Sequence, residues 1–305
     1  ALQLPAEAAQ GGAFPRGAGE REETEEGQEA LPAPLERGAG AEGELPLPAP
    51  LAAPGMLPDD TLAEAGRKTL LYHFAEMLRH EEGTLLGVDI EALHDMRVAT
   101  RRMRAAMDVF GPAYKPATVK KHLKGLRLAG RALGRVRDLD VFIEKAERYA
   151  LSLEPAQRPG LDPLLANWRA ERDQDRIELA AHLSSKAHTR FIQKFNQFVQ
   201  TPGLGVPPAD QGAPASTLPA ATLVRHMAPA LIYTRLAAVR AFDAILPTAS
   251  VPQLHLLRIE FKKLRYALEF FQEVLGPEAR PVINAIKKVQ DHLGDLQDAE
   301  VACQR

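Results

Sequence analysis

The sequence predicts an all-α protein built from two similar antiparallel helical bundles. Apolar residues recur at helical spacing through most of the chain, and aromatic residues make up only 6% of a composition rich in alanine and leucine. One pattern of residues also returns about 160 positions later, which indicates an internal duplication and not a short solenoid repeat. At 305 residues the chain is long enough to bury a core. We expect two bundles related by a pseudo-two-fold axis.

Charge is distributed unevenly along the chain. The formal net charge is −2 at pH 7, but residues 1–55 carry ten acidic and three basic side chains, which leaves 35 basic and 30 acidic ones in the remainder. The single cysteine, Cys303, excludes an internal disulfide and a cysteine-based zinc site. No apolar stretch is long enough to span a membrane. These features predict a cytoplasmic protein.

Residues 1–57 are predicted to be a disordered acidic linker rich in proline, glycine and alanine. Few bulky apolar residues are available there to offset the entropy lost on ordering. An alternative is an acidic arm that shields a basic surface of the same chain. Residues 58–305 form the predicted helical domain.

The first half of this domain spans residues 58–200. Its first helix starts near Asp59 and ends at Gly83. The second is capped by Asp89 and stopped by Gly111-Pro112. A third runs from Pro116 to about Leu133, and a break or tight turn at 134–140 leads to a fourth, which ends near Leu153. Helices at about 161–185 and 187–200 complete this half.

A linker at 201–219, with five prolines and three glycines, separates the halves. A helix at about 220–245 follows. Ser250 and Gln253 then have the spacing of a capping box, which predicts the start of the next helix. The second half, 220–305, reaches Arg305 just inside its fourth predicted helix, so it looks truncated relative to the first.

The helix after Asp89 has a very positive face. His94, Arg97, Arg101 and Arg104 fall within an arc of roughly 80°, and no carboxylate interleaves with them. Like charges so arranged repel one another, so we expect an anion to bind there. The next helix carries a second stripe, made of Lys120, Lys124, Arg127 and Arg131.

The same pattern returns in the second half. With an offset of 161 residues, the counterparts are His255, Arg258, Lys262, Lys263 and Arg265. With an offset of 160, Arg127, Leu133-Gly134 and Asp138 return as Lys287, Leu293-Gly294 and Asp298. We expect the two aspartates to start helices or to orient basic side chains through ion pairs.

Three functions are compatible with these stripes besides plain solvated helix faces. Closely spaced arginine forks and lysine charges suit a chain of phosphates. The dipeptide His94-Asp95 is that of the HD-type metal-dependent phosphohydrolases, but a two-residue motif is weak and its second-half counterpart is His255-Leu256. A nucleic-acid-binding module is the third possibility, although the stripes interleave no exposed aromatic side chains for base stacking.

These motifs resemble those of the CHAD domain, the conserved-histidine α-helical domain. The resemblance rests on His94-x-x-Arg97-Val98-x-x-Arg101-Arg102-x-Arg104, on the run from Leu133 to Val141 and on their second-half counterparts, and it covers roughly residues 60–305. It implies an all-α fold with a basic central groove or pore. It also implies binding of inorganic polyphosphate, association with polyphosphate granules, and a CYTH domain preceding the chain or associated with it.

The sequence therefore predicts a non-enzymatic module with no cofactor, no metal and no catalytic residue. The predicted polyphosphate-binding residues are His94, Arg97, Arg101, Arg102, Arg104, Lys120, Lys124, Arg127, Arg131, Arg135, His255, Arg258, Lys262, Lys263, Arg265, Tyr266 and Lys287.

Overall fold

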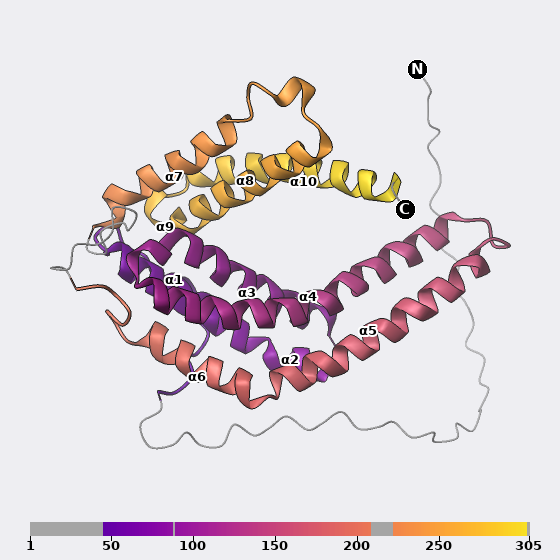
Figure 1. Cartoon of the computed structure of the whole chain (residues 1–305), viewed down its shortest axis with the longest axis horizontal. Coiled ribbons are helices and arrows are strands. Elements are labelled where there is room, and N and C mark those ends of the chain that lie inside the picture. The colour runs from indigo at the N-terminus through magenta and orange to yellow at the C-terminus, as the bar shows by residue number, and fades with distance from the viewer. Residues whose placement is uncertain (1–44, 88, 209–221, 304–305) are drawn as a thin grey trace, which may run out of the picture. The chain divides into compact units, whose positions relative to one another are not determined.

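The computed structural model describes residues 45–87, 89–208 and 222–303, and every regular element named in these ranges is a helix (Figure 1). The all-α prediction is confirmed. Of the two predicted linkers, 1–57 and 201–219, the parts 1–44 and 209–219 lie outside the described residues. The pseudo-two-fold relation of the halves stays a prediction.

The helices of the first half are α1 (Leu62–Arg79), α2 (Glu81–Leu86), α3 (Ile90–Phe110), α4 (Pro116–Ser152), α5 (Asp162–Leu183) and α6 (Lys186–Gln200). Those of the second half are α7 (Val224–Arg240), α8 (Val251–Phe270), α9 (Gln272–Leu275) and α10 (Ala279–Cys303). Short 3-10 turns occupy Gly111–Ala113, Arg158–Leu161 and Leu246–Thr248.

The predicted break at residues 134–140 is wrong, because α4 continues through it to Ser152. A glycine inside a helix costs about 1 kcal/mol relative to alanine. The apolar spacing nevertheless continues past Gly134, with Val136, Leu139 and Ile143 all buried. Burial of these side chains outweighs the glycine penalty.

Two of the predicted helix starts are confirmed by their caps. The side chain of Asp89 accepts a hydrogen bond from the Glu91 N–H at 2.8 Å, which satisfies one of the free donors at the start of α3. Ser250 and Gln253 form the predicted capping box of α8. The basic stripes of α3 and α8 therefore follow capped helix starts.

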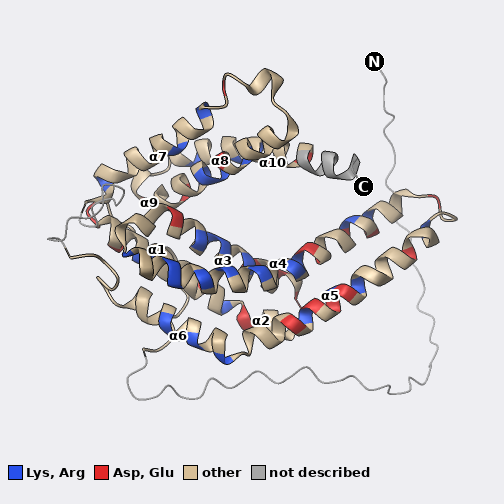
Figure 2. Cartoon of the chain, in the orientation of Figure 1, with Lys and Arg blue, Asp and Glu red and all other residues tan. Residues whose placement is uncertain are grey.

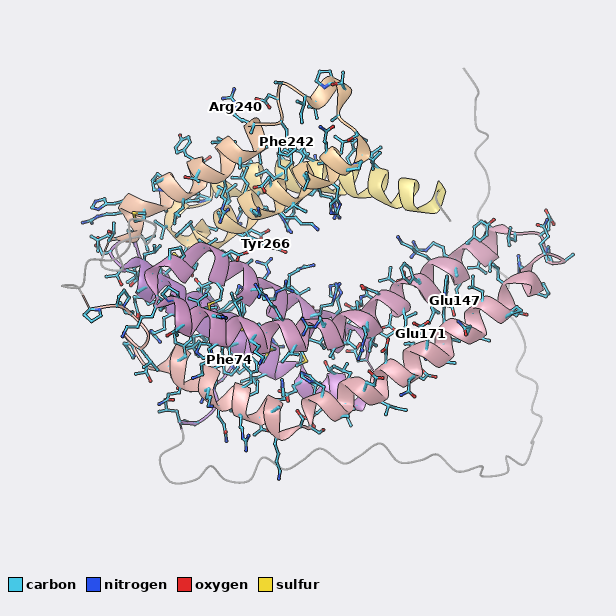
Figure 3. All side chains as sticks on the ribbon, viewed as in Figure 1. Phe74, Glu147, Glu171, Arg240, Phe242 and Tyr266 are labelled. Atoms are coloured by element: carbon cyan, nitrogen blue, oxygen red, sulfur yellow. The ribbon has the colours of Figure 1, made fainter. Side chains whose placement is uncertain are left out.

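The main core joins the two halves. Phe74 of α1 packs on Phe195 of α6, with ring centroids 5.0 Å apart (Figure 3). Phe110, at the end of α3, contacts Phe270 and Phe271 of the second half at 6.0 and 5.5 Å. A smaller cluster within the second half includes Leu257, Leu264 and Ile283. The aromatic contacts at Phe110 hold α3 and α8 together.

Residues 45–57, within the predicted linker, pack against the helical domain. The side-chain amide of Asn196 donates to the Leu45 carbonyl at 2.8 Å, and the Met56 N–H donates to Glu273 at 2.7 Å. The Met56 side chain is buried. This part of the predicted linker is a strap on the domain, because its backbone polar groups find partners on α6 and α9.

The halves differ where α6 packs. In α4, His122, Ala129 and Val136 are buried, and His122 stacks on Phe198 of α6 at 4.6 Å. Their counterparts on α10 at the 160-residue offset are Val282, Val289 and Leu296, which are 50%, 40% and 42% exposed. Among the described residues no element takes the place of α6 over this stripe of α10.

Buried histidines predict acid lability. Burial, followed by the nearby Lys121, lowers the pKa of His122 to about 4. The unfolded chain takes up this proton near its ordinary pKa of about 6.5, so the free energy of unfolding falls as the pH drops from 6.5 towards 4. The loss reaches about 1.4 kcal/mol per pH unit. We expect His122→Leu to flatten this slope in denaturant titrations. Equal slopes in the two proteins would contradict protonation-linked unfolding at His122.

Candidate anion-binding site

Cationic side chains from the two halves meet where α3 packs against α8. Lys and Arg residues recur along α3, α4 and α8, whereas Asp and Glu gather on α5 (Figure 2). We define the cationic cluster as Arg97 and Arg101 of α3 together with Arg258, Lys262 and Arg265 of α8. These five residues come from the predicted stripe of α3 and from its second-half counterpart on α8.

The charges in the cationic cluster act on one another. Burial lowers the pKa of Lys262, and Arg258, Arg101, Arg265 and Arg97 lower it further. Burial also lowers the pKa of Arg101, with Tyr266 opposing the shift and Arg97 and Arg265 adding to it. The two stripes are therefore close enough to repel each other across the interface between the halves.

Two glycines of the long helices face arginines of the cluster. A Cβ at Gly134 of α4 would lie 3.9 Å from Nε of Arg97, and one at Gly294 of α10 would lie 3.1 Å from a terminal nitrogen of Arg258. The two glycines correspond at the 160-residue offset. Each half thus places its first stripe arginine against the same glycine position. A Cβ would be at ordinary contact distance at Gly134 but crowded at Gly294, so the close approach of the arginine requires glycine only in the second half.

Ion pairs and hydrogen bonds orient these arginines. Arg97 donates to Asp138 at 3.2 Å, as expected for that aspartate, and Arg258 donates from Nε to the Gln290 carbonyl at 3.3 Å. The side chain of the second aspartate, Asp298, lies outside the described residues. The first arginine of each stripe is therefore held by the following long helix.

Glu269 bridges the halves. Its side chain is 8% exposed and forms ion pairs with Arg102 of α3 at 3.0 Å and Arg265 of α8 at 3.2 Å. Glu269 lies one turn beyond Arg265, as Asp108 lies one turn beyond Arg104 in the first half (269 − 108 = 161). The stripes of α3 and α8 contain no acidic residue, but a carboxylate follows the last arginine of each stripe by one helical turn.

Tyr266 and the two histidines differ in their surroundings. The Tyr266 ring is buried, stacks on Phe270 with centroids 6.2 Å apart and lies under the guanidinium of Arg265 at 4.9 Å (Figure 3). His94 is half-buried, whereas its counterpart His255 is exposed. The two histidines are therefore not in equivalent environments.

Two predicted residues lie apart from the cationic cluster. Lys263 pairs with Glu260 at 2.6 Å, and it lies roughly 140° around α8 from Arg258. Arg135 pairs with Asp175 at 3.1 Å and Glu178 at 2.6 Å on the acidic face of α5. The position of Lys263 outside the helical arc of its stripe can be recognised from the sequence. The acidic partners of Arg135 cannot, because they lie about 40 residues further along the chain.

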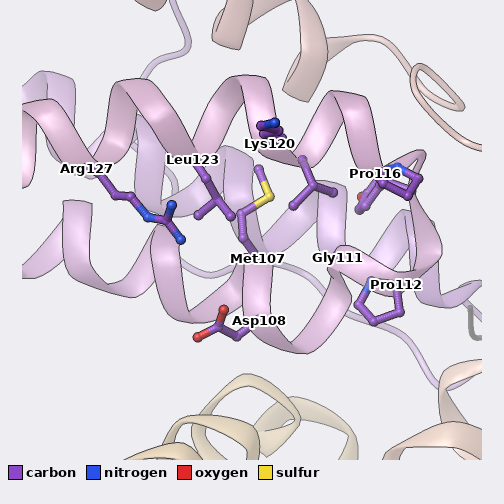
Figure 4. Close-up of a pocket in the computed structure, with 10 residues that line it drawn as sticks. Met107, Asp108, Gly111, Pro112, Pro116, Lys120, Leu123 and Arg127 are labelled. Carbon is purple, nitrogen blue, oxygen red and sulfur yellow. The ribbon is translucent and has the colours of Figure 1, made fainter. Parts of the chain in front are cut away.

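The other predicted cations of the first half lie on α3 and α4 outside the cluster. Arg104 of α3 is exposed, and a Cβ at Gly130 of α4 would lie 3.6 Å from its guanidinium. The stripe of α4 is also exposed; it consists of Lys120, Lys124, Arg127 and Arg131. Lys120 and Arg127 project over an apolar floor that includes Met107 and Leu123, in a pocket of about 430 Å³ (Figure 4).

A second pocket occupies the equivalent place in the second half. Its volume is about 320 Å³, and it is lined by Arg102, Glu269, Gln272, Arg280, Ile283, Asn284 and Lys287. Glu269 corresponds to Asp108 of the first pocket at the 161-residue offset. At the 160-residue offset, Arg280 corresponds to Lys120, Ile283 to Leu123 and Lys287 to Arg127. Arg280, Gln272 and Asn284 were absent from the predicted residues, although the offset from Lys120 could have identified Arg280.

The described residues contain no group of three or more His, Cys, Asp or Glu side chains placed to hold a metal ion. Asp95, of the His94-Asp95 dipeptide, instead lies 3.7 Å from His80. In the described part of the chain, no helix has the length and apolar character needed to cross a membrane.

Comparison with known proteins identifies the family. The family model of the CHAD domain matches residues 68–305. The chain belongs to the CHAD domain family. Its fold is similar to the crystal structure of the CHAD domain from the plant Ricinus communis, with a TM-score of 0.62, 24% sequence identity and coverage of 84% of this chain and 85% of that one. A search of curated proteins found no match. The predicted CHAD resemblance is thus confirmed, and the match includes α3, α4, α8 and α10.

Proposed function

We propose that this CHAD domain binds inorganic polyphosphate on a surface formed by the cationic cluster and the basic side chains of α4. The observation that carries the proposal is the convergence of Arg97 and Arg101 of α3 with Arg258 and Lys262 of α8. Beyond the effect of burial, the three arginines together lower the pKa of Lys262. Membership of the CHAD family supports a polyphosphate-related role in general.

The chemistry of the surface suits a polymer of phosphates. Arginine forks donate pairs of hydrogen bonds to phosphate oxygens, and lysines add point charges. Repulsion among the cations of the cluster is relieved when the polyanion binds. Binding also releases the counterions that surround the free polymer, so affinity falls steeply with salt.

Two other functions have weaker support. Nucleic-acid recognition commonly uses exposed aromatic side chains that stack on bases, but Tyr266, the aromatic residue at the cluster, is buried under Arg265. An HD-type phosphohydrolase needs metal ligands around His94 and Asp95. Asp95 faces His80, and the described residues add no further ligands of that kind.

We extend the proposal to location and partners. A domain that binds long polyphosphate chains is expected to associate with polyphosphate granules in the cytoplasm. A CYTH domain, fused to the chain or associated with it, stays a prediction from the family resemblance.

The proposal is tested by measuring the affinity for long-chain polyphosphate at increasing sodium chloride concentration. We expect the logarithm of the binding constant to fall linearly with the logarithm of salt concentration, with a slope that reflects several phosphate contacts. Weak binding that ignores ionic strength would refute polyphosphate binding.

Two further arms of this experiment separate the alternatives. RNA of matched total charge should compete poorly with polyphosphate, and preferential RNA binding would favour a nucleic-acid function. Phosphate release that requires a divalent metal and is lost in Asp95→Asn would favour the phosphohydrolase.

A further inference from the structure

The pocket between α3, α8, α9 and α10 has the lining of a discrete phosphate site. We propose that it binds a dianionic terminal phosphoryl group. Arg102 enters it from α3, Arg280 and Lys287 from α10, and the side-chain amides of Gln272 and Asn284 complete its polar lining. The volume of about 320 Å³ leaves room for one phosphoryl group with its ordered water.

Charge in this pocket favours a dianion. Three cations and the single carboxylate of Glu269 leave a net charge of two positive units on the lining. Glu269 is already paired with Arg102 and Arg265, so its carboxylate fixes the position of Arg102. Arg280 and Lys287 are exposed and form no ion pair among the described residues. They are therefore available to an anion.

The charge of the lining distinguishes the end of a phosphate chain from its middle. A terminal phosphoryl group carries up to two charges and three oxygens that accept hydrogen bonds. An internal phosphate of a polymer carries one charge and two such oxygens. The two net positive charges of the lining match those of a terminal group, whereas an internal phosphate would neutralise only one of them.

The equivalent pocket of the first half lacks this donor set. Gly111 stands where the second pocket has Gln272, and the lining includes Met107, Val119 and Leu123. Its two cations, Lys120 and Arg127, are opposed by Asp108. The net charge of that lining is one positive unit, so the site is specific to the second half.

Two sources can supply the terminal phosphoryl group. One is the end of a polyphosphate chain whose other phosphates lie on the cationic cluster. The cluster adjoins the pocket, because Glu269 of the pocket lining pairs with Arg265 of the cluster. The other is a free phosphate ion or a phosphate ester. The first source rests on the proposed function, and the second does not.

Titration with inorganic phosphate alone tests the pocket. We expect Arg280→Gln to weaken phosphate binding about ten-fold, the usual effect of losing a charge-assisted hydrogen bond. Lys288→Gln is the matched control, because it removes an exposed charge from the neighbouring position of α10 outside the pocket. Equal effects of the two substitutions, or none from Arg280→Gln, would overturn the proposal.

A polymer arm identifies the source. Polyphosphate of one chain length is compared with free ends and with ends capped as phosphoramidates. If chain ends occupy the pocket, the wild type prefers free ends and Arg280→Gln abolishes the preference. Equal affinity for the two polymers, with Arg280-dependent phosphate binding, supports the pocket but rejects the chain end as its source. Arg280-dependent phosphate binding without any polyphosphate binding would refute the proposed function and leave the pocket standing.

Discussion

Replacing Arg101 or Lys262 by glutamine is expected to weaken long-chain polyphosphate binding about ten-fold in each case, and the double variant much more. Each single variant loses one charge-assisted hydrogen bond to phosphate. Such a bond typically contributes about 1.5–3 kcal/mol, which corresponds to about ten- to hundred-fold in affinity. The two residues lie on α3 and α8, and beyond the effect of burial Arg101 lowers the pKa of Lys262, so both belong to one site. Fluorescence anisotropy at fixed salt measures the effect.

The stability of these variants supplies a second signature. Because Arg101 and Lys262 repel each other in the free protein, neither substitution should lower the unfolding temperature, and each should raise it slightly at low salt. Lys194→Gln removes one exposed positive charge from α6 and serves as the control for net charge. Equal losses of affinity in Lys194→Gln and Lys262→Gln would show that net charge alone governs binding.

Replacing Phe110 by alanine is expected to destabilise the domain by about 3–5 kcal/mol, the usual result for a buried aromatic residue. Phe110 is fully buried and contacts Phe270 and Phe271 across the interface between the halves. For a chain of this size, such a loss lowers the unfolding temperature by about 10 °C.

Thermal unfolding followed by circular dichroism measures this change, with Tyr149→Ala as the control because that side chain is 58% exposed. If Phe110 also fixes α3 against α8, polyphosphate binding should weaken in Phe110→Ala below its unfolding temperature. Unchanged stability in Phe110→Ala would contradict the assignment of one core spanning both halves.

The sequence indicated the helices and the basic stripes because both depend on local spacing. The face of α3 could be read from the positions of Arg97, Arg101 and Arg104 alone, and the 161-residue repeat pointed to Arg258, Lys262 and Arg265. The caps at Asp89 and Ser250 were readable for the same reason. Local patterns of this kind need no knowledge of tertiary contacts.

The predictions failed where tertiary packing decides the outcome. Gly134 suggested a break, but buried apolar side chains recur past it at Val136, Leu139 and Ile143, and α4 continues. Residues 45–57 look like a linker, yet Asn196 and Glu273 bind their backbone. The pairing of Arg102 with Glu269 joins residues 167 positions apart (269 − 102), and no sequence pattern indicates such a partner.

The central claim is that the stripes of α3 and α8 form one site. Isothermal titration with an oligophosphate long enough to reach both stripes tests it through the stoichiometry. We expect one oligophosphate per chain, and Lys262→Gln should lower the affinity without changing that number. Two oligophosphates per wild-type chain, falling to one in Lys262→Gln, would show that each half binds independently and would contradict the claim.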